Sequence, residues 1–312
     1  MDLNKIFIKN ATPTKVGGQA VMEGVMMKGS SSMATSIRLP DGSITTDIQK
    51  NKKPGAIAKI PLLRGIYALI QSMVTGTRTL MYSAEVLEEA GAQVEKDKFD
   101  LWIEKKFGDK ANTVILYFSV IVALVFSVGF FIILPTLLTN AMGAVTQNPL
   151  WLNLFEGILR ILLFVIYILI ISRLKDIRRV FQYHGAEHKS IHCYENGLDL
   201  TVENCRSFPT LHPRCGTSFL MFVMVISLLL YSFLGWPSWI VRIASRIIFI
   251  PLVAGISYEL LKFAGKSSSS FIKFISIPGL LLQKLTTVEP DDDQLEVALT
   301  SLKAVLGEDA NE

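Results

Sequence analysis

The sequence predicts a mainly α-helical, polytopic membrane protein with about four transmembrane helices, a small N-terminal cytoplasmic β element and amphipathic helices. Half of its 312 residues are hydrophobic, only 19% are charged, and the mean hydropathy is +0.42. Soluble domains carry about 25% charged residues. The apolar residues are concentrated in long runs, and the basic residues gather between them. Together these features exclude a disordered or fibrous chain and argue against an ordinary soluble enzyme.

Four apolar stretches predict the transmembrane helices. The first lies within residues 111–155, which are 45 residues without a charge and begin with Thr113–Pro135 as the first span. A helix needs about 20 apolar residues to cross a bilayer. The other three stretches are residues 157–172, 216–235 and 239–258.

The distribution of basic residues predicts the orientation. Sixteen Lys and Arg precede the first span, seven lie in residues 173–214, and five follow Tyr258. The connecting segments 136–155 and 236–238 contain none. Because cytoplasmic loops are enriched in Lys and Arg, we expect a multi-pass protein of the cell membrane with both termini in the cytoplasm. The net charge of +4 then has a topological origin, and we expect the lipid bilayer, not nucleic acid, as a partner.

The chain divides into four predicted segments. Residues 1–55 form a small cytoplasmic β-containing segment, because Pro40-Asp41-Gly42 is a turn signal between the strand-like runs Ala34–Leu39 and Ser43–Ile48. Residues 56–112 hold a linker and an interfacial or re-entrant helix, since the uncharged Gly65–Thr77 is too short to span. Residues 113–258 form the four-helix membrane domain. Residues 259–312 form a cytoplasmic tail, in which Asp291–Leu306 places its apolar residues on one helical face.

All four histidines and all three cysteines lie in one segment, His184–Cys215. Within YHGAEHKSIHCYE, three histidines (His184, His188 and His192) recur every fourth residue, so a helix would align them on one face. Two imidazoles at i and i+4 can bind one zinc ion, but the outer two would lie about 12 Å apart along the axis. Either one pair binds a metal and the third histidine does something else, or the helix breaks near Cys193.

The same motif also indicates hydrolytic chemistry. His184-Gly185-Ala186-Glu187-His188 fits the H-x-x-E-H pattern, in which two histidines hold a metal and the glutamate is the general base. His212-Pro213-Arg214-Cys215 offers His212 or Cys215 as a third ligand, and His192 is a supporting or alternative ligand. We expect a divalent metal, with zinc favoured. The alternatives are a structural metal site, or histidines that only hydrogen-bond lipid headgroups or acids.

Ionisable residues inside the predicted spans form a second candidate site. Glu156 and Arg160 are spaced i,i+4, as are Arg242 and Arg246. Intramembrane charges are costly and frequently functional, so the three arginines predict a site for an anion such as a lipid phosphate. The alternative is snorkelling to the outer surface together with a Glu156–Arg160 pair. Glu23 is predicted as a turn residue, with a metal ligand as the alternative.

Five motifs in order resemble those of a known family. GGQAVMEGVMMKG, IPLLRG, LMYSAE, YHGAEHKSIHCYE and HPRCGTSF are similar to the YqhQ family of bacterial membrane proteins, a domain-of-unknown-function family. The resemblance covers most of the chain from about Gly17. It implies a metal-dependent enzyme and supports the metal reading of the His, Glu and Cys positions, without identifying a substrate.

These observations give one leading hypothesis and two alternatives. The first is a membrane-embedded metal-dependent hydrolase with a cytoplasm-facing site and a lipid-linked molecule or membrane peptide as substrate. The second is a non-enzymatic membrane scaffold with a structural metal site. The third is a transporter or lipid-handling protein that uses the arginines.

Overall fold

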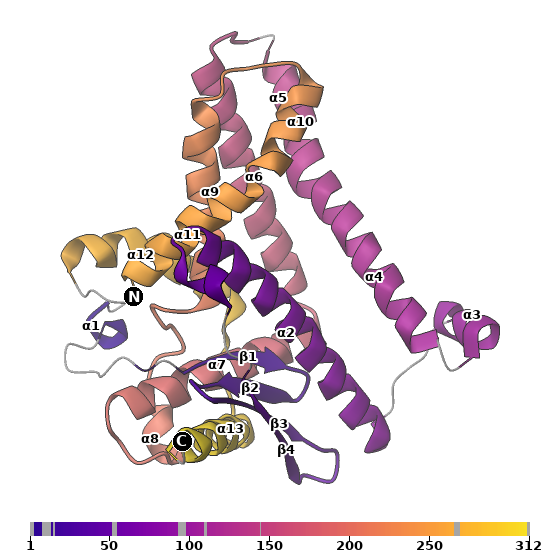
Figure 1. Cartoon of the computed structure of the whole chain (residues 1–312), viewed down its shortest axis with the longest axis vertical. Helices are drawn as coiled ribbons and strands as arrows, with labels where there is room; N and C mark the ends of the chain where they lie inside the picture. Colours follow the sequence, from indigo (N-terminus) through magenta and orange to yellow (C-terminus); the bar gives the residue numbers. More distant parts are fainter. Residues whose placement is uncertain are drawn as a thin grey trace. The chain divides into compact units, whose positions relative to one another are not determined.

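The computed structural model describes residues 3–7, 14, 16–51, 55–92, 98–108, 111–143, 145–264 and 269–310. The chain forms two compact units. Unit 1 contains residues 1–90, 165–226 and 251–312, and unit 2 contains residues 91–164 and 227–250. Figure 1 labels the α-helices and strands of both.

A four-stranded antiparallel sheet forms the N-terminal part of unit 1, with the order β1-β2-β3-β4. Its strands are β1 (Gly17–Val21), β2 (Gly24–Lys28), β3 (Ser32–Arg38) and β4 (Ile44–Lys50). The predicted turn joins β3 to β4: Gly42 has a φ of +87°, and Asp41 Oδ1 accepts a hydrogen bond of 2.9 Å from the Ser43 amide. The small N-terminal β element is therefore confirmed.

The core of unit 1 lies between this sheet and two helices, α7 (Lys175–Glu195) and α13 (Asp292–Ala310). α13 contacts β2, β3 and α7, and α7 contacts β1 (Figure 1). The apolar face predicted for the C-terminal helix is buried here; its fully or nearly fully buried residues are Leu295, Ala298, Leu299 and Leu302. A reciprocal cap begins α13, since Asp291 Oδ1 accepts from the Gln294 amide and Gln294 Oε1 accepts from the Asp291 amide.

The remaining elements of unit 1 are helical. They are α1 (Leu3–Ile6), η1 (Ala56–Lys59), α2 (Leu63–Glu89), α8 (Val202–Arg206), α11 (Ile250–Ala264) and α12 (Ser270–Thr286), with the end of α6 (Pro149–Ile171) and the beginning of α9 (Gly216–Ser232). α2 is one continuous helix of 27 residues, so the uncharged stretch 65–77 continues into a longer helix. It approaches α11 closely at Gly65, where an added Cβ would lie 2.8 Å from the Tyr258 side chain and 3.0 Å from Gly255.

Unit 2 consists of helices. They are α3 (Lys98–Phe107), α4 (Ala111–Val128), the π-helical segment η3 (Gly129–Ile133), α5 (Leu134–Met142) and α10 (Trp239–Ile248), with parts of α6 (Pro149–Ile171) and α9 (Gly216–Ser232). Pro135 at the start of α5 continues the helix from η3 without an interruption.

Two helical segments in the described chain are long and apolar enough to cross a membrane, Tyr117–Met142 and Pro149–Ile171. A third is possible if α10 and α11, which meet at a bend of 44°, form one broken span. The apolar stretch at 216–235 yields only the 17-residue helix α9. The described chain therefore has two or three segments of spanning length where the sequence predicts four.

Candidate metal centre

α7 carries the three regularly spaced histidines and is unbroken from Lys175 to Glu195. It ends at Glu195, with Asn196 as its C-cap, and the following Gly197 adopts a φ of +67°. The helix does not break near Cys193, so one alternative from the sequence is wrong. His184, His188 and His192 lie along one helix, and they cannot all reach one ion.

The structure divides the predicted ligands into two groups. In the first group, His184, His188 and Cys215 place one potential ligand atom each within 4.8 Å of one another. His184 Nε2 lies 3.2 Å from Cys215 Sγ, and the two imidazole centroids are 4.4 Å apart. Cys215 immediately precedes α9 and approaches α7 from the segment that contains His212.

Backbone carbonyls orient both histidines of the first group. His184 Nδ1 lies 2.8 Å from the Thr286 oxygen, and His188 Nδ1 lies 2.5 Å from the Thr210 oxygen. A carbonyl oxygen only accepts, so each Nδ1 carries the hydrogen and the Nε2 lone pair remains available. Metal-binding histidines usually have this arrangement. Nε2 of His188 is buried and has no hydrogen-bond partner among the described residues.

Glu187 lies between these two histidines in the sequence and is 5% exposed. The Gly18 amide of β1 donates to its carboxylate, but Oε2 has no partner in the described part of the chain. Burial raises the pKa of Glu187 to about 7. Burial would also raise the pKa of the Cys215 thiol, yet His188 and hydrogen bonds with Thr217 outweigh it and lower that pKa. The pKa of the Cys215 thiol is thus lowered beside a carboxyl group whose pKa is raised.

A cavity of about 370 Å³ gives access to the first group. His184, Glu187, His188 and Cys215 line it together with residues 17–20 of β1. This volume lies within the range of small-molecule sites.

The second group contains His192, Glu195 and His212. Its polar atoms already have partners: His192 Nε2 lies 2.9 Å from the Leu211 oxygen, and Glu195 Oε2 lies 3.3 Å from His212 Nε2. The other carboxylate oxygen accepts from the Thr14 amide and is paired with Arg214. Burial lowers the pKa of His192 to about 3 and that of His212 to about 4, so both imidazoles are neutral. The second group is therefore a hydrogen-bonded network in which the Glu195 carboxylate is already paired with Arg214.

The comparisons with known proteins identify a family. Residues 60–308 match the family model described as "Protein of unknown function (DUF1385)". The chain belongs to this family. It is also similar to "Uncharacterized protein YqhQ" of Bacillus subtilis (strain 168), with 37% identity over 303 residues that cover 96% of this chain and 94% of that protein. No solved structure matches it.

The sequence did not point to several residues that shape the site of this DUF1385 protein. Gln283 holds His212 through both backbone groups: its Oε1 accepts from the His212 amide at 2.9 Å and its Nε2 donates to the His212 oxygen at 2.9 Å. Glu195 is the carboxylate of the second group. It is the last residue of the motif YHGAEHKSIHCYE, and this position in the motif could have identified it from the sequence. The carbonyls of Thr210 and Thr286 carry no sequence signal, because any residue supplies a carbonyl.

The other predicted site residues lie elsewhere. Glu23 occupies the turn between β1 and β2 with a φ of +50°, and Arg179 pairs with its carboxylate, which agrees with the turn prediction. Arg160, Arg242 and Arg246 lie on α6 and α10 within unit 2.

Proposed function

We propose that this DUF1385 protein is an integral membrane protein with a cytoplasm-facing divalent metal site, and that it is a hydrolase of a membrane-associated substrate. The observation that carries this proposal is a pair of buried polar atoms without partners in the described part of the chain, one in the first group and one on the neighbouring Glu187. His188 Nε2 and Glu187 Oε2 are buried without a partner among the described residues, and both side chains line the same cavity as His184 and Cys215. A buried polar atom without a partner is costly, so a ligand that completes these atoms is favoured.

The donors of the first group suit zinc. Two imidazole nitrogens and one thiolate are among the usual ligands of catalytic zinc, which has three protein ligands and one open position. When bound, zinc would lower the pKa of water and polarise a carbonyl or phosphoryl oxygen. His184, His188 and Cys215 would hold the ion.

The remaining residues have separate tasks. Glu187 would accept a proton from water through Oε2, while the Gly18 amide keeps the carboxylate directed into the cavity. The carbonyls that bind each Nδ1 fix the tautomers of His184 and His188. The cavity of about 370 Å³ would leave room for a substrate group.

The membrane part of the proposal retains the predicted topology. Four crossings would use Tyr117–Met142, Pro149–Ile171, α9 and the bent pair of α10 and α11. α9, at 17 residues, would be about 25 Å long, shorter than the hydrocarbon core of about 30 Å, so local thinning of the bilayer would accompany it. The basic residues would then face the cytoplasm with both termini, and a lipid-linked molecule or membrane peptide would reach the site.

Cobalt substitution tests the metal site directly. In wild type, bound Co²⁺ should show a thiolate charge-transfer band, and the band should vanish in Cys215→Ser. Cys205→Ala is the matched control, because this cysteine is also buried but lies in the core. Addition of acetohydroxamate should change the visible cobalt spectrum, since a three-ligand site accepts a further ligand. A protein without stoichiometric cobalt or zinc would refute the metal site, and a spectrum unaffected by hydroxamate would favour the structural-metal alternative.

Glu187→Gln tests the hydrolase. The variant should bind cobalt like wild type, because Glu187 is not a proposed ligand. Proteoliposomes of a bacterial total lipid extract should release soluble products with wild type and not with Glu187→Gln, measured by mass spectrometry. Equal product release by the two proteins would contradict the assigned role of the carboxylate.

A further inference from the structure

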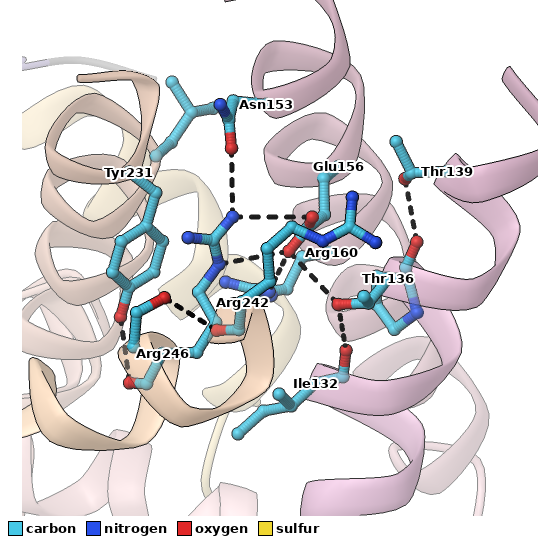
Figure 2. Close-up of polar contacts among 12 residues, drawn as sticks. Ile132, Thr136, Thr139, Asn153, Glu156, Arg160, Tyr231, Arg242 and Arg246 are labelled. Carbon is cyan, nitrogen blue, oxygen red and sulfur yellow. Dashed lines mark hydrogen bonds and ion pairs between the residues drawn. The ribbon is translucent and has the colours of Figure 1, made fainter. Parts of the chain in front are cut away.

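Unit 2 contains a buried cluster with unequal numbers of positive and negative side chains. Arg160, Arg242 and Arg246 surround a single acid, Glu156, on helices α6 and α10 (Figure 2). Glu156, Arg242 and Arg246 are 2%, 1% and 3% exposed. Because arginine does not deprotonate in proteins, the four groups together carry an excess of two positive charges.

Glu156 compensates two of the three arginines. Its Oε1 lies 2.8 Å from Arg160 Nη2 and 3.3 Å from Arg246 Nε. Figure 2 shows the carboxylate between these guanidinium groups. Arg160 also donates to the Phe131 oxygen at 2.9 Å, and Arg246 donates to Asn153 Oδ1 at 2.9 Å. The side chains of Arg160 and Arg246 thus have a carboxylate and a neutral acceptor each.

Arg242 has no comparable partner. Its Nη2 donates to Asn140 Oδ1 at 2.5 Å, and its guanidinium lies 3.7 Å from the centroid of the Trp236 ring. Its Nε and Nη1 are buried and have no acceptor among the described residues. Nε carries one hydrogen and Nη1 carries two, so three of the five N–H donors are unused. Trp236 and Asn140 hold the group in place without neutralising it.

We infer that Arg242 is the binding group for a phosphate oxyanion, carried by a lipid headgroup or by a free phosphate. A guanidinium matches phosphate oxygens in geometry and charge, and the excess of positive charge in the cluster favours an anionic group, whether a lipid phosphodiester or free phosphate. Arg160 and Arg246 contribute to the local field, while Arg242 supplies two buried nitrogens without an acceptor among the described residues. This refines the anion site expected from the sequence, which gave the three arginines equal roles. The inference is independent of the metal centre.

The direction in which Arg242→Gln shifts the melting temperature distinguishes an anion-binding role of Arg242 from a purely structural role. In maltoside detergent without phosphate, Arg242 is an uncompensated buried charge, so Arg242→Gln should melt at or above the wild-type temperature. A structural role through Trp236 and Asn140 requires the opposite, a lower melting temperature. The control is Arg206→Gln, which alters an exposed ion pair with Asp292 and should change neither stability nor binding.

Two ligands in the same detergent distinguish the sources of phosphate. We expect inorganic phosphate, or a short-chain phosphatidylglycerol, to raise the melting temperature of wild type in a saturable way. The dissociation constant should increase at least about tenfold in Arg242→Gln, since a hydrogen bond to a charged group is being removed. A response to phosphatidylglycerol alone assigns a lipid headgroup, and a response to inorganic phosphate alone assigns a soluble anion. A response to both assigns the phosphate group itself. No response to either ligand, or equal binding by Arg242→Gln, overturns the inference.

Discussion

Substituting Gly18 by alanine should displace Glu187 and destabilise unit 1. A Cβ at residue 18 would lie 2.7 Å from the Met26 oxygen and 2.9 Å from Glu187 Cδ. Met26 belongs to β2 and is opposite Gln19 in the ladder, so its backbone cannot recede without loss of strand pairing. The Glu187 carboxylate is the part that can move, and it would then lose its hydrogen bond with the Gly18 amide.

The expected magnitude follows from overpacking. Extra atoms in a packed site cost about 1–3 kcal/mol, and the lower entropy of the unfolded alanine chain offsets about 0.4–1 kcal/mol. The net loss of about 1–2 kcal/mol corresponds to a fall of roughly 2–8 °C in melting temperature for a unit of about 200 residues. Far-ultraviolet circular dichroism during heating in one detergent measures it, since all four tryptophans lie in unit 2 and would not report on unit 1.

The neighbouring glycine provides a matched control. A Cβ at Gly17 would meet no atom within 4 Å, so Gly17→Ala should melt at the wild-type temperature or slightly above it. Both variants should be compared in the cobalt and proteoliposome assays. If Gly18→Ala melts as high as Gly17→Ala and releases product at the wild-type rate, the packing of β1 against Glu187 is not as inferred.

Three further substitutions test other parts of the structure. Glu156→Gln removes the only acid of the unit 2 cluster among the described residues and should cost about 3–5 kcal/mol, measured by unfolding in sodium dodecyl sulfate; an unchanged transition would refute the pairing. Asp291→Ala removes the cap of α13 and should cost about 1 kcal/mol in thermal unfolding, whereas Asp293→Ala should preserve the cap. Arg214→Leu leaves the buried carboxylate of the second group without its cation. We expect a cost of about 2–3 kcal/mol, below that of a fully buried pair because Arg214 is 22% exposed, and no measurable change in Arg206→Leu.

Local signals predicted the parts of the fold that depend on nearby residues. The Pro40-Asp41-Gly42 turn and the flanking alternation gave the β3–β4 hairpin, because turn geometry and strand register are set within a few residues. The leucine spacing after Asp291 gave α13 and its buried face. The spans were less predictable. The charge-free stretch 216–235 contains a helix of only 17 residues, since the chain leaves the helix before Trp236-Pro237.

The partition of the histidines depends on contacts between distant segments. From spacing alone, His184, His188 and His192 are equivalent positions on one helical face. Their different surroundings arise because residues 210–215 run beside α7, which places the Thr210 oxygen at His188 and the Leu211 oxygen at His192. No local pattern encodes that register. The sequence therefore located the candidate ligands without determining which of them lie together.

The two groups differ in a way that limits the metal capacity of the proposed centre. The rings of His184, His188, His212 and His192 form a continuous series, with centroid distances of 4.4, 5.7 and 4.5 Å, so a pair of adjacent ions is geometrically conceivable. The charges argue against it. Glu195 already pairs with Arg214, and a divalent ion in the second group would have to displace that guanidinium. The first group combines a thiol whose pKa is lowered with an imidazole nitrogen that lacks a partner among the described residues. The proposed centre thus takes one ion per chain, while the second group holds the segment around His212 against α7.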